Sequence, residues 1–153
     1  MRISKRSNRS GWLAFGPAAL ALTVGVAAHA SQTVEVYNKV SAAEAAMLQA
    51  ISRHDTGLLR KTIAGLGPLI DDALKRKKAG GPVSSCDMAA HSLGFAGVNL
   101  SEAITQRGRE RQALIDDARR AAQDFNRDMT ACDAQAGRKA GNHTGVEKAL
   151  RAL

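Results

Sequence analysis

The most regular pattern in this chain is a stripe of apolar side chains close to its carboxyl end. Between residues 114 and 132 the apolar residues recur every three or four positions, which is the repeat of one face of an α-helix. The stripe consists of Leu114, Ala118, Ala121, Phe125, Met129 and Cys132. Charged residues cover much of the remaining helix surface. Because an amphipathic helix depends on tertiary packing for most of its stability, this segment must pack against another element.

The segment just before the stripe predicts that partner, a helix from about residue 85 to residue 107. Ser84 and Asp87 have the spacing of a capping box at its start. Apolar residues from Cys86 to Ile104 then share one helical face. Gly108 follows, and glycine is well suited to the turn that a reversal of the chain needs. We therefore expect an antiparallel helical hairpin here.

The two cysteines fit this hairpin. Cys86 falls in the first turn of one helix, Cys132 falls near the end of the other, and their midpoint is residue 109, beside Gly108. Residues equidistant from the turn of an antiparallel hairpin lie opposite each other, so we expect a disulfide between them. On the chain-entropy model such a bond stabilises a fold by about 4 kcal/mol. The alternative is a pair of buried free thiols that pack as small apolar side chains.

Two more helices are predicted upstream of the hairpin. Ser41 and Glu44 have capping-box spacing, which predicts a helix start at the beginning of an apolar run. Residues 54–57 should end that helix, and Asp55 can cap the next one. The next helix keeps its apolar period as far as Leu74.

A second feature of this helix is the interruption in its middle. Gly65, Gly67 and Pro68 predict either a kink or the junction of two short helices. Its end is clear, because the basic run from residue 75 to residue 78 suits the negative end of a helix dipole. Residues 79–82 then read Ala-Gly-Gly-Pro, which is a stop signal.

The fold that these elements predict is all-α. We expect an up-and-down four-helix bundle over residues 31–135, made of two antiparallel helical hairpins. Residues 31–153 are rich in alanine and contain few aromatic residues, a composition that suits helices packed face to face better than stacked sheets. Residues 136–153 are expected to form a flexible basic tail, with a short helix from Val146 to Leu153.

The first 30 residues predict a secretory signal peptide. Arg2, Lys5, Arg6 and Arg9 precede an apolar stretch from residue 12 to residue 28, and the small residues Ala28 and Ala30 flank His29 as in a cleavage site. The mature chain should begin at Ser31 and reach the periplasm, or be secreted if the source has no outer membrane. The alternative, a retained membrane span, is weakened by Gly16 and Pro17. We expect no transmembrane anchor after cleavage.

Cleavage also changes the charge. The full chain has 22 Lys and Arg against 14 Asp and Glu, a formal net charge of +8. Four of the basic residues lie in the predicted signal, so the mature chain carries +4. This modest charge and the predicted export both argue against a nucleic acid partner.

The sequence contains no familiar catalytic or cofactor motif. There is no CxxCH haem attachment motif, no G-x-S-x-G elbow and no glycine-rich phosphate loop. The adjacent carboxylates Asp71-Asp72 and Asp116-Asp117 diverge by about 100° on a helix, so neither pair forms a catalytic dyad. We expect a protein that is not an enzyme and that uses no cofactor.

Metal ligands are also sparse. The histidines after residue 30 are His54, His91 and His143, which we place in a turn, away from the apolar stripe, and in the tail. Asp87 and His91 are four residues apart, but two ligands do not complete a zinc site, so we expect no metal site. Met47 and the methionine of the carboxyl-terminal stripe leave open the alternative of a small haem- or metal-binding bundle.

Two basic clusters are the remaining candidates for binding. We expect them at the bundle end that carries the disulfide, where they could form one patch for an anionic partner. The candidate residues are Lys75, Arg76, Lys77, Lys78, Arg138 and Lys139. The alternative is that these charges only complement helix dipoles and keep the protein soluble. Arg107, Arg109 and Arg111 mark the opposite tip of the bundle.

These features favour an exported, non-enzymatic helical protein that acts as a binding or interaction module in the periplasm or cell envelope. Its partner is expected to be another envelope protein or an anionic envelope component. The alternative is a small haem- or metal-binding carrier built on the same bundle. The oligomeric state is left open.

Overall fold

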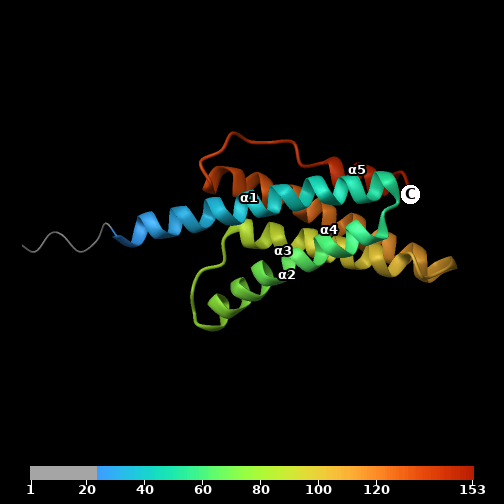
Figure 1. Cartoon of the computed structure of the whole chain (residues 1–153), viewed down its shortest axis with the longest axis horizontal. Coiled ribbons are helices and arrows are strands. Elements are labelled where there is room, and N and C mark those ends of the chain that lie inside the picture. The colour runs from blue at the N-terminus through green and yellow to red at the C-terminus, as the bar shows by residue number, and fades with distance from the viewer. Residues whose placement is uncertain (1–23) are drawn as a thin grey trace, which may run out of the picture.

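Helix α3 (Ser85–Ala103) lies at the centre of the molecule and packs against α4 (Gly108–Gln135), α2 (Thr56–Lys78) and α1 (Val24–Arg53). In the computed structural model, residues 24–153 are described, with side chains from residue 31 onward. Within that range the protein has five helices and no strand, so the prediction of an all-α bundle is confirmed. The chain reverses direction at each connection from α1 to α4, and α2 diverges from α1 toward its carboxyl end (Figure 1).

The hairpin of α3 and α4 agrees closely with its prediction. Ser84 accepts a hydrogen bond from the Asp87 backbone N–H, and the Asp87 carboxylate accepts one from the Ser84 N–H, which completes the capping box. The helix ends at Ala103, about one turn earlier than expected. Ile104, which the pattern assigned to the core, is therefore exposed at the end of the helix.

Small residues on α3 let its neighbours approach closely. A Cβ atom built on Gly97 would lie 2.7 Å from Cγ1 of Ile63 in α2 and 2.7 Å from Cε of Met47 in α1. A Cβ atom on Gly94 would lie 3.0 Å from Cδ1 of Ile70 in α2. Gly97 therefore lies where three helices meet, and no larger residue fits there without a shift of its neighbours.

Helix α1 starts well before the predicted capping box. Ser41 lies in the middle of α1, so the predicted helix start at that residue is wrong. No glycine or proline lies between Val26 and Thr56 to interrupt the helix, and the local capping pattern is overridden. Residues 1–23 of the predicted signal lie outside the described residues. From Ser31 onward, where side chains are described, the first buried side chain of α1 is Val36.

Helix α2 is one helix and not two. Asp55 caps it as predicted, since its carboxylate accepts a hydrogen bond of 2.8 Å from the Leu58 backbone N–H. Pro68 lies inside the helix with its side chain exposed, where its ring meets solvent and not the core. The buried residues of α2 occur on both sides of Pro68, and this packing holds the two halves in one element. They are Leu59, Thr62, Leu66 and Ala73.

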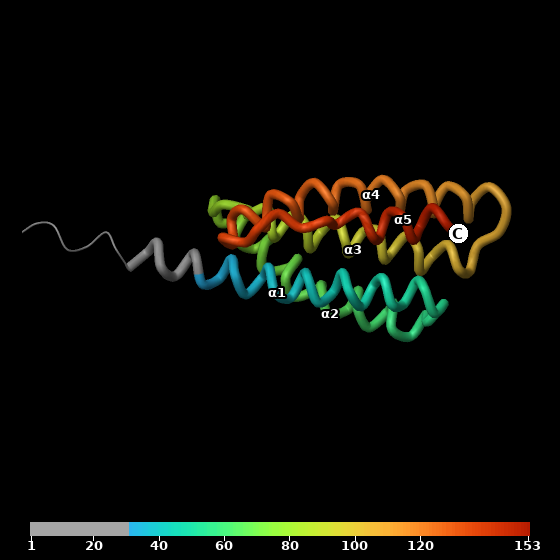
Figure 2. The backbone as a smooth tube through the Cα atoms, turned by 90° about the horizontal axis from the view of Figure 1, so that it is seen from above, coloured from blue at the N-terminus to red at the C-terminus, as the bar shows by residue number. Residues whose placement is uncertain are grey.

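The carboxyl-terminal segment folds back onto the bundle. After α4 the chain returns along the molecule, and the short helix α5 (Gly145–Arg151) lies near the opposite end (Figures 1 and 2). Val146 and Leu150 of α5 are completely or almost completely buried, and α5 packs against α1 and α4. The expected short helix is present. The expectation of a flexible tail is corrected, because an apolar pair one turn apart is enough to dock the helix.

Among the residues from 24 onward, no helix combines the length and the apolar character that crossing a bilayer requires. The apolar stretch from residue 12 to residue 28 is mostly outside that range.

We expect Gly97→Ala to destabilise the protein by about 1–3 kcal/mol, because the added methyl group overpacks the contact of α1, α2 and α3. Gly65→Ala is the matched control. Gly65 lies inside α2, and apart from its own stretch of helix no atom lies within 4 Å of the position that a Cβ would take there, so alanine should stabilise the helix by about 0.5–1 kcal/mol. Chemical denaturation of the variants measures both free energies of unfolding. Equal effects at the two positions would contradict the close approach at Gly97.

Candidate functional site

The disulfide joins the start of α3 to the end of α4. Cys86 and Cys132 are bonded, their Cα atoms are 4.6 Å apart, and both residues are completely buried. The predicted pairing and the register of the hairpin are therefore confirmed. Neither sulfur is exposed, so the bond cross-links the core and offers no accessible thiol for chemistry.

One residue of the predicted basic patch has a structural role beside this disulfide. Arg76, near the end of α2, donates a hydrogen bond of 2.6 Å to the Asp87 carboxylate. Asp87 is almost fully buried and also belongs to the capping box of α3. The Arg76 guanidinium is therefore used to hold α2 against α3, because a buried carboxylate is costly without such a partner.

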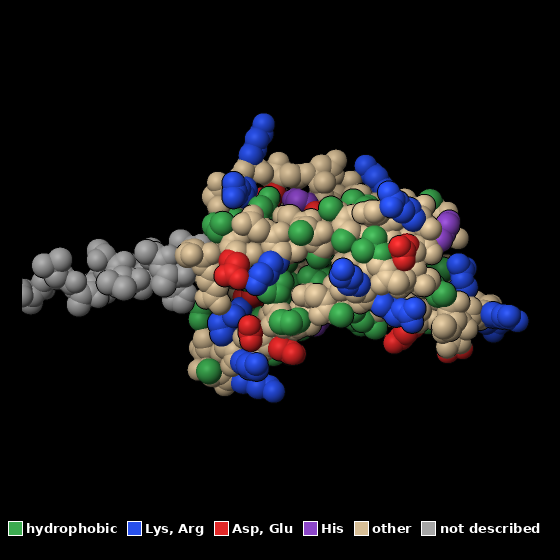
Figure 3. All heavy atoms as spheres, in the orientation of Figure 1, with side chains coloured by type: hydrophobic (Ala, Val, Ile, Leu, Met, Phe, Trp, Pro, Cys, Tyr) green, Lys and Arg blue, Asp and Glu red, His purple; other side chains and the backbone are tan. Residues whose placement is uncertain are grey.

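The other members of the predicted patch share one end of the bundle but lie on different sides of it. The carboxyl ends of α2 and α4 are at the same end of the bundle, and in the view of Figure 1 they are well separated, one below and one above α1. Lys and Arg atoms at this end are interspersed with Asp and Glu atoms on the face shown in Figure 3. Nζ of Lys75 lies 3.6 Å from Oδ1 of Asp72, which makes an ion pair. The Arg138 guanidinium carbon lies 5.6 Å from the centre of the Tyr37 ring, which it covers. Lys77 lines a groove between α2 and α3 that is described below, and Arg138 and Lys139 are not part of the wall of that groove.

The predicted positions of two histidines hold. His54 is exposed in the turn between α1 and α2, and His91 is exposed on α3. Asp87, the residue that could share a metal with His91, instead binds Arg76. In the described part of the chain, no three His, Cys, Asp or Glu side chains are arranged to hold a metal ion.

His143 is the residue that sequence reasoning missed. It was placed in a flexible tail, yet only 8% of its surface is exposed. Its Nδ1 atom lies 2.8 Å from Oε2 of Glu44 in α1, and its Nε2 atom lies 3.1 Å from Oδ2 of Asp133 in α4. The imidazole therefore bridges two carboxylates from two helices. We call Glu44, Asp133 and His143 the buried histidine cluster.

The backbone of the returning loop completes this cluster. Gly141 donates a hydrogen bond of 2.6 Å from its N–H to Oδ2 of Asp133. A Cβ atom on Gly141 would lie only 2.7 Å from Nε2 of His143, so a side chain at this position would collide with the imidazole. The Phe125 ring packs edge-on against the His143 ring, with 6.1 Å between their centres. No sequence pattern pairs these residues, since Glu44 and His143 are 99 positions apart.

The cluster favours the protonated imidazole. Burial is the largest single influence and lowers the pKa of His143, but the hydrogen bonds to Glu44 and Asp133 and the charges of both carboxylates act in the opposite direction and outweigh it. The pKa of His143 is therefore raised above its ordinary value of about 6.5. Both ring nitrogens face carboxylates in a buried setting, so the cluster fastens the loop to the bundle and has no free nitrogen to offer a substrate or a metal.

The most unusual surface of the molecule is the solvent-facing side of α3. Met88, Phe95 and Val98 are exposed there by 45%, 52% and 39%, and His91 lies between them. We call these four residues the outer face of α3. They follow one another at intervals of three, four and three residues, so they form a single strip along the helix. The apolar pattern in the sequence placed the opposite side of this helix in the core and predicted nothing about this side.

A groove lies beside the outer face. It is a cavity of about 280 Å³ between α2 and α3, and Met88 and His91 belong to its wall. The α2 side contributes Ile70, Ala73 and Leu74, of which Leu74 is 45% exposed. Lys77 lines the same groove near the end of α2. The outer face and the groove together make one apolar surface with a basic edge.

Comparisons with known proteins found no match to this chain among family models, curated proteins or solved structures.

Replacing both cysteines with serine should lower the stability of the protein by about 4 kcal/mol, because the unfolded chain gains entropy when the cross-link is lost. The far-ultraviolet circular dichroism signal at low temperature should remain helical, since the apolar faces still pack. Ala131→Ser, an exposed position next to Cys132, serves as the control and should leave the melting temperature unchanged. Two reactive thiols in the denatured, unreduced protein would contradict the bond.

The buried histidine cluster predicts a specific pH dependence. The folded-state pKa of His143 is raised, so the stability that the cluster contributes is fully present below about pH 6.5 and is lost as the pH rises through the raised value. His143→Gln keeps hydrogen-bonding groups and removes the charge, so the free energy of unfolding should lose this slope.

The control is His91→Gln, which changes an exposed histidine and should keep the slope of the parent protein. Urea denaturation between about pH 6 and pH 9 measures the free energy of unfolding of the parent protein and of both variants. The same slope in His143→Gln and in the parent would show that the cluster does not titrate as described.

Proposed function

We propose that this protein is an exported, non-enzymatic interaction module that binds an amphipathic helix of another envelope protein along the outer face of α3. The observation that carries this proposal is the exposure of Met88, Phe95 and Val98 in one strip. Single exposed apolar residues are normal on protein surfaces, but several large ones along one side of a helix are typical of an interaction site.

The spacing of the strip supports a helical partner. Intervals of three and four residues are the spacing of an apolar seam between two packed helices, where side chains of one helix insert between those of the other. Phe95 strengthens the case, because residues 31–153 contain few aromatic side chains and this one is more than half exposed. Aromatic residues and methionine are enriched in the centres of protein interfaces.

Charge indicates what kind of helix fits. Lys77 lines the groove, and Lys78 follows it at the end of α2. Asp87 also lines the groove, but its charge is compensated by Arg76. The basic edge therefore favours a partner helix that carries acidic residues on one flank, which steer it into register with the apolar strip.

Export rests on separate support. The basic, apolar and small-residue segments of the first 30 residues have the order of a secretory signal. The buried disulfide suits an oxidising compartment such as the periplasm. Because an exported protein meets other proteins of the cell envelope, we propose that its partner is one of them.

The proposal is tested by photocrosslinking in the native host. A photoreactive phenylalanine analogue replaces Phe95, and the same analogue at Thr130, an exposed position on α4, is the control. We expect a crosslinked species at position 95 and none at position 130, with the protein recovered from the envelope as a chain that begins at Ser31. Mass spectrometry of the adduct should place the crosslink in an amphipathic helix of the partner.

Further substitutions test whether the adduct at position 95 depends on the outer face and on the groove beside it. Met88→Ser and Lys77→Glu should each reduce the yield of the adduct at position 95, whereas Lys139→Glu, a charge reversal away from the groove, should not. Equal adducts at positions 95 and 130, or no adduct at all, would overturn the proposal. An adduct with a second copy of this chain would also overturn it and would assign the outer face to self-association.

The haem- or metal-binding carrier is the alternative that the sequence left open. A Soret band, or one metal ion per chain, in protein purified from its native compartment would favour that alternative over the interaction module.

A further inference from the structure

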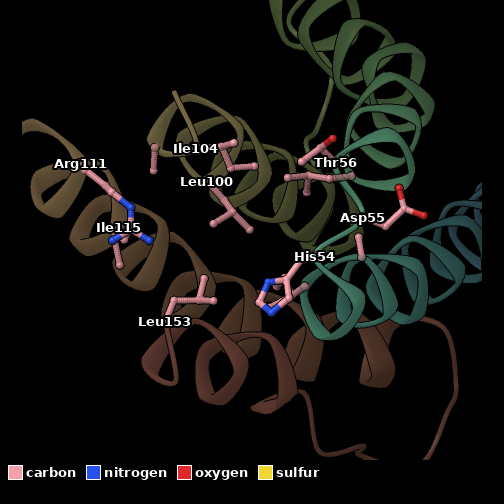
Figure 4. A pocket seen from close by; sticks show the side chains of 12 residues that line it. His54, Asp55, Thr56, Leu100, Ile104, Arg111, Ile115 and Leu153 are labelled. Carbon is pink, nitrogen blue, oxygen red and sulfur yellow. The ribbon is translucent and has the colours of Figure 1, made fainter. Parts of the chain in front are cut away.

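We propose that a cavity at the disulfide-free end of the bundle binds a small amphipathic carboxylate, a molecule with one carboxylate group and a short apolar body. The cavity has a volume of about 340 Å³, within the range of small-molecule sites. It lies where the turn between α1 and α2, the end of α3, the start of α4 and the residue Leu153 come together (Figure 4). It is separate from the outer face of α3, so this inference does not rest on the proposed function.

The floor of the cavity is apolar and well packed. It is formed by side chains that are buried in the core, namely Ile51, Leu59, Leu100, Ala103 and Ile115. Two apolar side chains at the edge are instead open to solvent, since Ile104 is 51% exposed and Leu153 is 40% exposed. The apolar body of a ligand would cover this surface and remove it from water, which is favourable.

Two nitrogen-bearing side chains flank this apolar surface. In Figure 4 the side chains of Arg111 and His54 lie on two sides of the space, with Leu100 between them. Across residues 31–153, neither side chain has an ion pair or a hydrogen bond to another side chain. A guanidinium with no protein partner, next to an apolar cavity, is suited to bind a carboxylate through two parallel hydrogen bonds.

The acidic residue in the cavity wall does not cancel this charge. Asp55 accepts the capping hydrogen bond from the Leu58 N–H, and its carboxylate is directed away from His54 in Figure 4. Arg107 is the N-cap of α4 and Arg109 lies in the first turn of that helix, so together with Arg111 they outnumber Glu110, the acidic residue of the same turn. The balance of charge at the cavity therefore favours an anion over a cation or a neutral molecule.

Binding is measured by titrating the ¹⁵N-labelled exported protein with octanoate and recording amide chemical shifts. We expect saturable shifts concentrated in residues 50–59, 100–104 and 111–115. Octan-1-ol has the same apolar body without the charge, and it should bind at least about tenfold more weakly.

Matched variants test the role of Arg111. Arg111→Gln keeps much of the shape of the side chain and removes its charge, and it should weaken octanoate binding by about tenfold. Arg109→Gln removes a neighbouring charge outside the cavity wall and should change the affinity by less than about twofold. His54→Asn should weaken binding while it tolerates the left-handed backbone at this position, where φ is 53°. Because all three positions are exposed, the variants should remain folded, and their circular dichroism spectra check this.

Three results would overturn the inference. The first is the absence of saturable shifts around the cavity, or shifts confined to the outer face of α3. The second is unchanged affinity in Arg111→Gln. The third is octan-1-ol binding as tightly as octanoate. None of these results bears on the crosslinking test at Phe95, so the two proposals can fail independently.

Discussion

The constraint on which the rest of the structure depends is the close packing of α3 against three other helices. Alanine and glycine on α3 allow this approach, and the contact at Gly97 leaves no room for a side chain. Because α1, α2 and α4 cover most of α3, a single strip of this apolar helix remains open to solvent. The outer face of α3 is therefore the part of this mostly buried helix that the other described helices leave uncovered.

Polar interactions fix the elements that apolar packing alone would leave loosely placed. Arg76 and Asp87 hold the diverging end of α2 to the start of α3. The buried histidine cluster holds the returning loop to both α1 and α4, which have little direct contact with each other. In each case a cation or hydrogen bonds offset the cost of burying a carboxylate. Because these partners meet the carboxylate in only one placement of the helices and the loop, the interaction favours that placement.

Local patterns in the sequence were sufficient for much of the fold. The capping box at Ser84 and the cap at Asp55 depend on residues close together, and the pairing of the two cysteines, whose midpoint lies beside Gly108, depends on one simple hairpin. The failures have a different origin. The pattern at Ser41 is a valid cap in isolation, but α1 runs through it because nothing upstream interrupts the helix. His143 could not be assigned, because its partners lie on two distant helices and no periodicity links them. The cavity at Arg111 was missed because its wall comes from segments far apart in the sequence and includes Ile104, which the pattern placed in the core.

The buried histidine cluster is also the contact that must close the longest stretch of chain among those described above. Glu44 and His143 are 99 positions apart, whereas the disulfide of the α3–α4 hairpin joins residues 46 positions apart. Because the entropy cost of closing a loop grows with its length, the hairpin can form before the returning loop and α5 dock. Until they dock, the residues that α5 covers stay accessible to chaperones and proteases.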